Sequence, residues 1–400
     1  MRHPGARALV LGLCLCSLYI GYEFARASSL VLFASRAAGV NGAYTASGGF
    51  FLSIATLALY GRGVELMGAK RTLLVSAAGC CAVFLGLAAA LSAYEPDAIP
   101  WAFVACLFAF RETYVSLIGT QVWALVSAEL KERGPETSRT WFCIIQGVSC
   151  ICSAFAGMAA GRLATAGGQF FLLLAAALSL VVITVAVAVT SGDTLGGGVS
   201  IGKGGSNGKL DSGGLLRVLR SSVSLFRRCP LLAALLAEAM VCQVLTATLN
   251  VSFNEAIRQS LVSQASAEPE AQAAGFVGKS FAFIGLLSGA LQLIVMPWAM
   301  LRVNPSLLLR TLPLVAGSGL LATLVSPGFR TTTVAFAITK ILDYSVRGTA
   351  LELVYQPMPE HERLLGKEAI ATVGVRIGRT VAHVALYCCL ALLEGAPPQR

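Results

Sequence analysis

Charged residues are scarce in this sequence. Lys, Arg, Asp and Glu make up 12% of the 400 residues, whereas hydrophobic residues make up 56%. A soluble globular domain carries charge on roughly a quarter of its residues. The shortage excludes an ordinary soluble domain, and many apolar runs reach the 18 or so residues that a membrane-spanning helix needs. We therefore predict an all-α polytopic membrane protein.

Several motifs of metal and nucleotide chemistry are also missing. The sequence has three His, and no two of its 12 Cys form a CxxC pair, which excludes the usual zinc sites. The phosphate-binding pattern GxxxxGK[ST] is absent, and no arrangement of nucleophile and base is visible. We expect no enzyme activity, no metal and no cofactor.

The positive charge is organised along the chain. The formal net charge is +10, and most Lys and Arg lie in short connections between apolar runs. Two acidic connections, SAYEPDAIP (92–100) and SQASAEPEAQAAG (263–275), fall on the opposite side. The positive-inside rule places the basic side in the cytoplasm or its equivalent. The cations therefore report membrane topology, and we expect the lipid bilayer, not nucleic acid, as the surrounding partner.

The apolar runs divide into two groups. We predict eleven spans, at about 8–34, 42–60, 72–94, 100–127, 141–161, 169–191, 230–252, 279–301, 307–327, 331–356 and 369–393. A Gly/Ser-rich and basic stretch separates the sixth from the seventh. This pattern predicts a six-helix bundle over 1–191, a flexible cytoplasmic linker over 192–229 and a bundle of about five helices over 230–400. Together with the Gly-rich basic turn GRGVELMGAKR (61–71), it is typical of the two-bundle major-facilitator plan, here with the twelfth helix apparently absent.

Ionisable residues inside the predicted spans are candidates for a binding site, because burying a charge in a membrane is costly. The segment KILDYSVRGTALELVYQPM (340–358) holds several of them. Lys340, Asp343 and Arg347 are spaced i, i+3 and i+7, which places them on one helix face. An Asp between two cations leaves a net positive charge, so we expect Lys340 and Arg347 to face a central cavity that binds an anion.

The end of the sequence resembles a known family. KILDYS, ELVYQPM, GKEAI and VRIGR are similar, in order, to the tenth- and eleventh-helix motifs of the ATP/ADP translocase (nucleotide exchange transporter) family of plastids and intracellular bacteria. YEFARASS (22–29) and the segment that begins at Glu112 resemble its first and fourth helices more weakly. The matching residues of the compelling region are Lys340, Tyr344, Ser345, Glu352, Tyr355, Pro357, Gly366, Lys367, Ile370, Arg376, Gly378 and Arg379.

The resemblance implies exchange of ATP for ADP, or of related nucleotides, by alternating access. It implies a monomer in a plastid envelope or a plasma membrane, with ATP and ADP as transported partners. The expected substrate-binding residues are Arg26, Glu112, Lys340, Asp343, Arg347, Glu352, Arg376 and Arg379. In this hypothesis the cations hold phosphates, and Glu112 and Asp343 pair with them in the empty protein.

Two other hypotheses stay open. Ser29, Leu351 and Ala371 occupy positions that are charged in the family. Loss of those charges favours a proton-coupled carrier of another small anion, with Asp343 or Glu112 carrying the proton. The short C-terminal part favours a protein that has the fold of a carrier but does not transport.

Overall fold

The computed structural model describes most of the chain as helix. The described residues are 4–36, 52, 55–56, 63, 66–94, 98–131, 135–189, 226–263, 269–355, 358, 370 and 374–394. The predicted linker and the predicted span at 42–60 lie almost wholly outside them.

Four long helices precede the predicted linker: α1 (Pro4–Arg36), α3 (Ala69–Ala93), α4 (Trp101–Lys131) and α5 (Pro135–Val189). The 55 residues of α5 are two helices joined by a kink at Gly167 and Gly168. Gly168 has φ +62°, a conformation that glycine adopts without the steric cost of a Cβ. The kink therefore separates the two spans predicted at 141–161 and 169–191.

The later helices contain two wide turns. They are α7 (Pro230–Ser263), α8 (Pro269–Ala290), η2 (Leu291–Val295), α9 (Met296–Arg302), α10 (Pro305–Val325), α11 (Phe329–Leu342), η3 (Asp343–Arg347), α12 (Gly348–Tyr355) and α14 (Val375–Glu394). The π-helical turns η2 and η3 each lie between two α-helical segments. Proline begins α7, α8 and α10, where its missing N–H has no intrahelical partner to lose.

Ten of the eleven predicted spans coincide with helices, but the count of eleven is not confirmed. Seven helices of the described part are long and apolar enough to cross a membrane by length and composition. The prediction at 42–60 falls on residues that are nearly all outside the description. The segments from α11 to α12 and α14 are helical but not among those seven. Their composition is more polar because they carry the charged residues of the predicted site.

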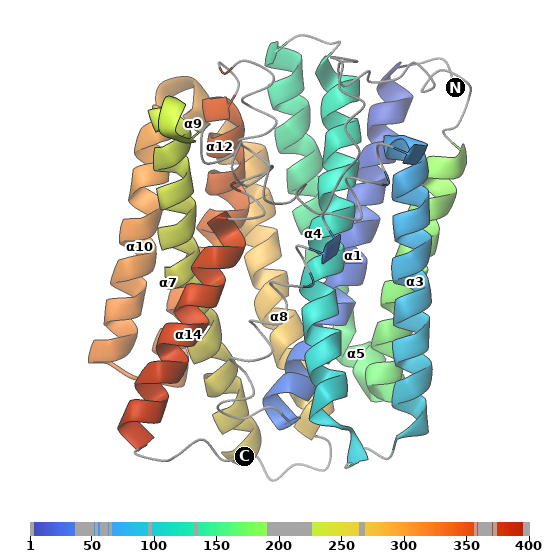
Figure 1. The fold of residues 1–400 in the computed structure, drawn as a ribbon, viewed down its shortest axis with the longest axis vertical. Helices are drawn as coiled ribbons and strands as arrows, with labels where there is room; N and C mark the ends of the chain where they lie inside the picture. The colour runs from blue at the N-terminus through green and yellow to red at the C-terminus, as the bar shows by residue number, and fades with distance from the viewer. Residues whose placement is uncertain are drawn as a thin grey trace.

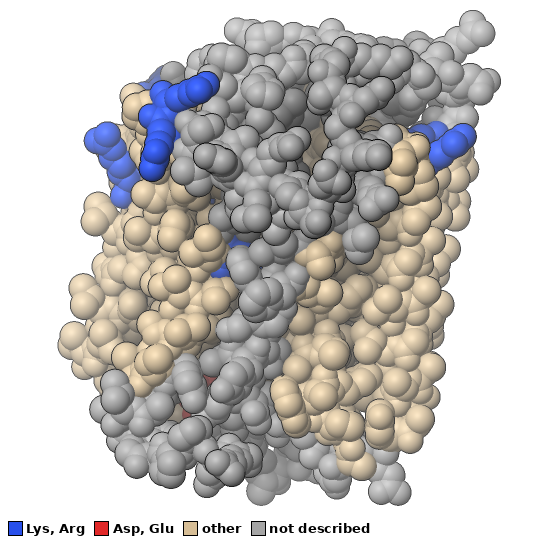
Figure 2. Space-filling view, viewed as in Figure 1, with Lys and Arg blue, Asp and Glu red and all other residues tan. Residues whose placement is uncertain are grey.

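The helices lie side by side along the long axis of the molecule (Figure 1). α1, α3, α4 and α5 form one side, and α7, α10, α12 and α14 form the other, with α8 between them. Lys and Arg side chains gather at the end where α3 and α7 begin and α9 ends (Figure 2). Exposed Arg71, Arg227, Arg228 and Arg302 lie at those helix ends. This placement agrees with a basic face on one side of the membrane.

Helices α5 and α8 approach each other closely along paired small residues. A Cβ added to Gly157 would lie 2.6 Å from the Gly278 carbonyl oxygen. A Cβ added to Gly161 would lie 2.8 Å from the Cα of Gly275. Small residues allow such backbone approach between membrane helices. The contact joins a helix before the predicted linker to one after it.

We expect Gly157→Val to destabilise the protein, because the added side chain would overlap the backbone of α8. Overpacking of this kind costs about 1–3 kcal/mol. The measurement is thermal unfolding in detergent. Gly79→Val is the matched control, because a Cβ at Gly79 on α3 meets nothing within 4 Å. Equal unfolding temperatures for the two variants would contradict a close contact of α5 with α8.

Candidate functional site

Ten charged side chains form a cluster where the helices pack against one another. The cations are Arg26, Arg111, Lys340, Arg347, Arg376 and Arg379, and the carboxylates are Glu23, Glu112, Glu238 and Asp343. Six cations face four carboxylates, so two positive charges stay unbalanced among the described side chains. Five of the six cations are at least nine-tenths buried. Because buried charges are costly unless paired, this surplus favours an anionic ligand.

Glu112 connects the two groups of helices. Its Oε1 accepts from Tyr22 at 3.1 Å and from Arg111 at 2.6 Å. Its Oε2 accepts from Nη1 of Arg379, on α14, at 2.7 Å. Arg376 donates to the backbone carbonyl of Glu112 at 3.3 Å. The carboxylate of α4 thus holds an arginine from the far end of the sequence.

Arg26 lies between two aromatic rings. Its guanidinium carbon is 4.2 Å from the ring centroid of Tyr22 and 3.9 Å from that of Phe281, on α8. Its Nη1 is 3.1 Å from Glu23 Oε1, and Ser153 donates to the same oxygen at 2.7 Å. A planar guanidinium can stack on rings and still present donors at its edge. Arg26 is therefore held in a fixed orientation at the contact of the two groups.

Arg347 is shared by two carboxylates. Its Nε donates to Glu238 Oε1 at 3.1 Å and its Nη2 to Glu238 Oε2 at 3.2 Å, a bidentate pair. Asp343 Oδ1 is 3.5 Å from Nη1 of the same residue. Glu238, on α7, also accepts from the thiol of Cys242. Arg347 is therefore the best neutralised cation in the cluster.

Lys340 has no such partner. The residue is 7% exposed, yet its ammonium group has no ion pair and no hydrogen bond to any residue that the structure describes. Its Nζ lies 5.8 Å from the ring centroid of Phe336 and 5.7 Å from that of Tyr344. Asp343 lies 3.5 Å from Arg347, whereas no ion pair between Asp343 and Lys340 is seen among the described residues, so the predicted pairing of Asp343 with cations on both sides stays a prediction.

The structure brings seven of the eight predicted residues into this cluster. Glu352 lies in α12, but its side chain is outside the described part. Ser29, where the family carries a charge, accepts a hydrogen bond from Arg111 at 2.9 Å. A neutral hydroxyl therefore contacts a cation at that place. The expectation that Lys340 and Arg347 face a central cavity stays a prediction, because both are buried in side-chain contacts.

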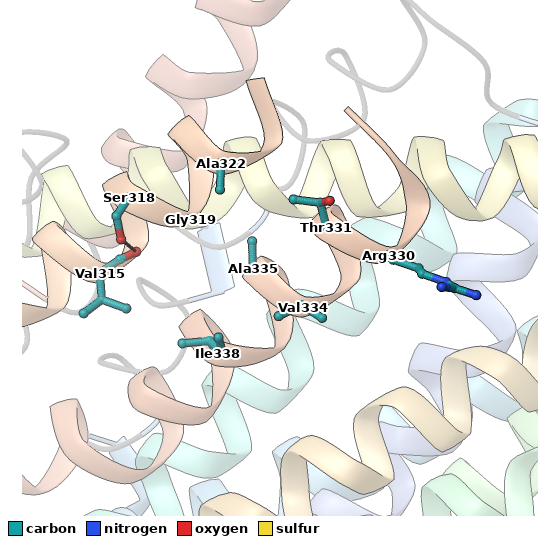
Figure 3. A pocket seen from close by; sticks show the side chains of 9 residues that line it. All are labelled: Val315, Ser318, Gly319, Ala322, Arg330, Thr331, Val334, Ala335 and Ile338. Atoms are coloured by element: carbon teal, nitrogen blue, oxygen red, sulfur yellow. Dashed lines mark hydrogen bonds between the residues drawn. The ribbon is translucent and has the colours of Figure 1, made fainter. Parts of the chain in front are cut away.

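A groove of about 490 Å³ lies elsewhere, between α10 and α11. Figure 3 shows its mostly apolar lining. The lining residues are Val315, Ser318, Gly319, Ala322, Arg330, Thr331, Val334, Ala335 and Ile338. None of them belongs to the charged cluster, and Val334 and Ile338 are exposed on the outer face. The groove is therefore separate from the candidate anion site.

Sequence reasoning missed the polar side chains that support the cluster. Gln243 accepts from Arg379 Nε at 2.8 Å, and Gln292 contacts the η3 turn. Both amides are at most 3% exposed. The sequence did indicate these residues, because a glutamine within a long apolar run is costly to bury unless its amide makes hydrogen bonds.

Comparison with known proteins identifies the fold. No family model matches the chain, and no curated protein matches it. Among solved structures, a mutant of the nucleoside transporter NupG matches with TM-score 0.62 at 13% identity over 98% of this chain and 92% of that one. An auto-inhibited POT family peptide transporter matches with TM-score 0.57 at 12% identity over 97% and 92%.

The chain is thus a multi-pass membrane protein with the major-facilitator fold. At this identity the two matches show the fold alone. They give no support to the narrower resemblance to ATP/ADP translocases, which rests on the residues of the sequence.

Proposed function

We propose that this protein is a secondary transporter that exchanges ATP for ADP, or related nucleotides, by alternating access. One observation carries the proposal. Among the described residues the buried cluster has two unbalanced positive charges, and two of its cations, Lys340 and Arg376, form no ion pair. The two fold matches are transporters by their titles, and the major-facilitator fold is one of transporters rather than enzymes.

The cluster can hold a polyphosphate from both groups of helices. Arg26 is on α1, Lys340 on α11 and Arg376 on α14. Guanidinium groups bind phosphate oxygens bidentately, and an ammonium adds a point charge. Arg26 already lies over the rings of Tyr22 and Phe281, and Phe336 stacks on Phe253 at 4.2 Å, so the partly exposed Tyr344, beside Lys340, is the ring best placed to face a ligand. A ring face of this kind is suited to a nucleobase, which would explain a nucleotide rather than inorganic phosphate.

The pairing of Glu112 gives a physical reason for exchange. In the empty protein Glu112 holds Arg379 across the two groups. Moving the groups apart would separate these partly buried charges, which costs free energy. A bound anion can replace the carboxylate as partner of Arg379, so reorientation is easier with substrate than without it. Glu112 therefore competes with substrate in this proposal.

Counter-exchange in proteoliposomes tests the proposal. Vesicles loaded with labelled ADP should release it rapidly when ATP is added outside, and only slowly in buffer. Protein-free vesicles give the background. Equal release with and without external nucleotide would contradict exchange, and no release in either condition would favour the fold of a carrier without transport.

One observation favours a second candidate, a proton-coupled carrier of another small anion. Two carboxylates share Arg347, and Asp343 has only a 3.5 Å contact with it. A carboxylate with so weak a partner inside a membrane can carry a proton. In that case an inward proton gradient should drive uptake into vesicles that contain no internal nucleotide. Uptake that needs internal nucleotide and ignores the gradient would exclude this candidate.

A further inference from the structure

Two π-helical turns lie against each other in the later group of helices. One, η2 (Leu291–Val295), interrupts the helix that contains α8, and the other, η3 (Asp343–Arg347), interrupts the helix that carries the cluster. A π-helical turn places an extra residue in the helix and changes the regular backbone hydrogen bonding. Such turns are frequent at functional sites. The carbonyl groups around η3 therefore need other partners.

Side chains of α8 and η2 supply those partners. Gln292 is fully buried, and its Nε2 donates to the carbonyl of Tyr344 at 3.3 Å and also to that of Ser345. The same amide lies 3.1 Å from Thr349 Oγ1. Ser288, one turn before Gln292, donates to the carbonyl of Ile341 at 3.4 Å. Ser288 and Gln292 thus contact the backbone in and next to η3 from one face of the helix formed by α8 and η2.

We propose that Gln292 is a positioning residue for the anion site: its amide stabilises the η3 turn and thereby sets the direction of Arg347 relative to Lys340. Lys340 precedes the turn and Arg347 ends it. One extra residue amounts to about 100° of rotation in a helix of 3.6 residues per turn. In this geometry Arg347 forms a bidentate pair with Glu238.

The part of this inference that concerns anion affinity rests on the proposed function. Gln292 contacts no cation of the cluster among its hydrogen-bond partners, so it would act only through the backbone of η3. This separates it from a residue that touches the substrate. A positioning role predicts a local change at η3 together with weaker binding, whereas a purely structural role predicts loss of stability everywhere.

The first measurement needs no substrate. Gln292→Leu keeps the side-chain size but removes the donors, and hydrogen exchange is followed by mass spectrometry in lipid nanodiscs. We expect at least tenfold faster exchange in peptides that cover 341–349, and unchanged exchange in α1 and α4. Gln169→Leu is the matched control, because Gln169 is also buried but lies at the kink of α5. If Gln292→Leu does not fold, Thr349→Val weakens the same contact more gently.

The second measurement uses ATP and inorganic triphosphate as probes. Gln292→Leu should raise the KM for ATP about tenfold and leave kcat within about twofold, and triphosphate binding should weaken similarly. Gln169→Leu should change neither. Faster exchange at η3 with unchanged KM and triphosphate binding would overturn the positioning role, as would unchanged exchange at η3 or an increase throughout the protein.

A third measurement separates failure of this inference from failure of the proposed function. If the wild type binds neither ATP nor triphosphate, the proposed function fails. The inference is then decided by exchange at η3 and by a double-mutant cycle of Gln292→Leu with Arg347→Lys, read as unfolding temperature. Non-additive shifts would support action through Arg347, and additive shifts would overturn it.

Discussion

Lys340→Met should raise the thermal stability of the empty protein and lower its affinity for ATP at least tenfold. The buried ammonium has no counter-ion among the residues that the structure describes, and holding an uncompensated ion in a protein interior costs several kcal/mol. Methionine removes this cost and keeps most of the apolar stem. Loss of a hydrogen bond to a charged phosphate costs about 1.5–3 kcal/mol, which is tenfold or more in affinity. The two measurements are thermal unfolding without ligand and transport normalised to protein amount.

The loss of affinity should depend on the charge of the nucleotide. ATP should lose more affinity than AMP, because AMP presents less charge to the missing cation. Lys279→Met is the matched control: it removes the same charge from an exposed position on α8 and should change neither property. A less stable variant with unchanged ATP affinity would mean that Lys340 stabilises the fold and does not bind the anion.

Glu112→Gln should lower stability strongly and loosen the exchange. The substitution leaves Arg111 and Arg379 without their carboxylate, and because the side chains of Glu112 and Arg379 are 20% and 32% exposed we expect a cost of about 1–3 kcal/mol, below that of a fully buried pair. Saturating ATP should recover more stability in the variant than in the wild type, because its phosphates supply the missing negative charge. Efflux of labelled ADP without external nucleotide should rise, because no pair then opposes reorientation of the empty protein.

Glu129→Gln provides the comparison for Glu112→Gln. Glu129 lies near the end of the same helix and is not among the residues that pair within the cluster. Its substitution should leave the unfolding temperature and the ADP efflux as in the wild type. If Glu112→Gln behaved in the same way, the contact between Glu112 and Arg379 could not be what couples the two groups of helices.

Much of the fold follows from the sequence alone. Long apolar runs can satisfy their backbone groups within a membrane only as helices or closed barrels, and their lengths fit helices. Ten predicted spans accordingly fall on helices, and the basic connections appear at one end of the molecule. The separation of α5 into two spans was also predictable, since the Gly167–Gly168 pair lies between two apolar runs.

The candidate cluster could be predicted only in part. Charged residues inside apolar runs are conspicuous, so Arg26, Glu112 and the charges of the predicted spans 331–356 and 369–393 were identified by type. Their partners were not, because an ion pair such as Glu112 with Arg379 joins positions more than 260 residues apart. Helical spacing constrains neighbours on one helix and carries no information about which distant helix faces them.

The sequence by itself determined that this chain is an all-α membrane protein whose interior carries more positive than negative charge. Only the tertiary structure decided which of these cations pair with carboxylates. Helical spacing predicted that Lys340, Asp343 and Arg347 share one face and that Asp343 lowers the cost of burying both cations. In the structure Arg347 pairs with Glu238 from a distant helix, and Gln292 from another helix contacts the π-helical turn at Asp343–Arg347. Local spacing assumes a regular helix, whereas contacts between helices decide where the helix departs from regularity.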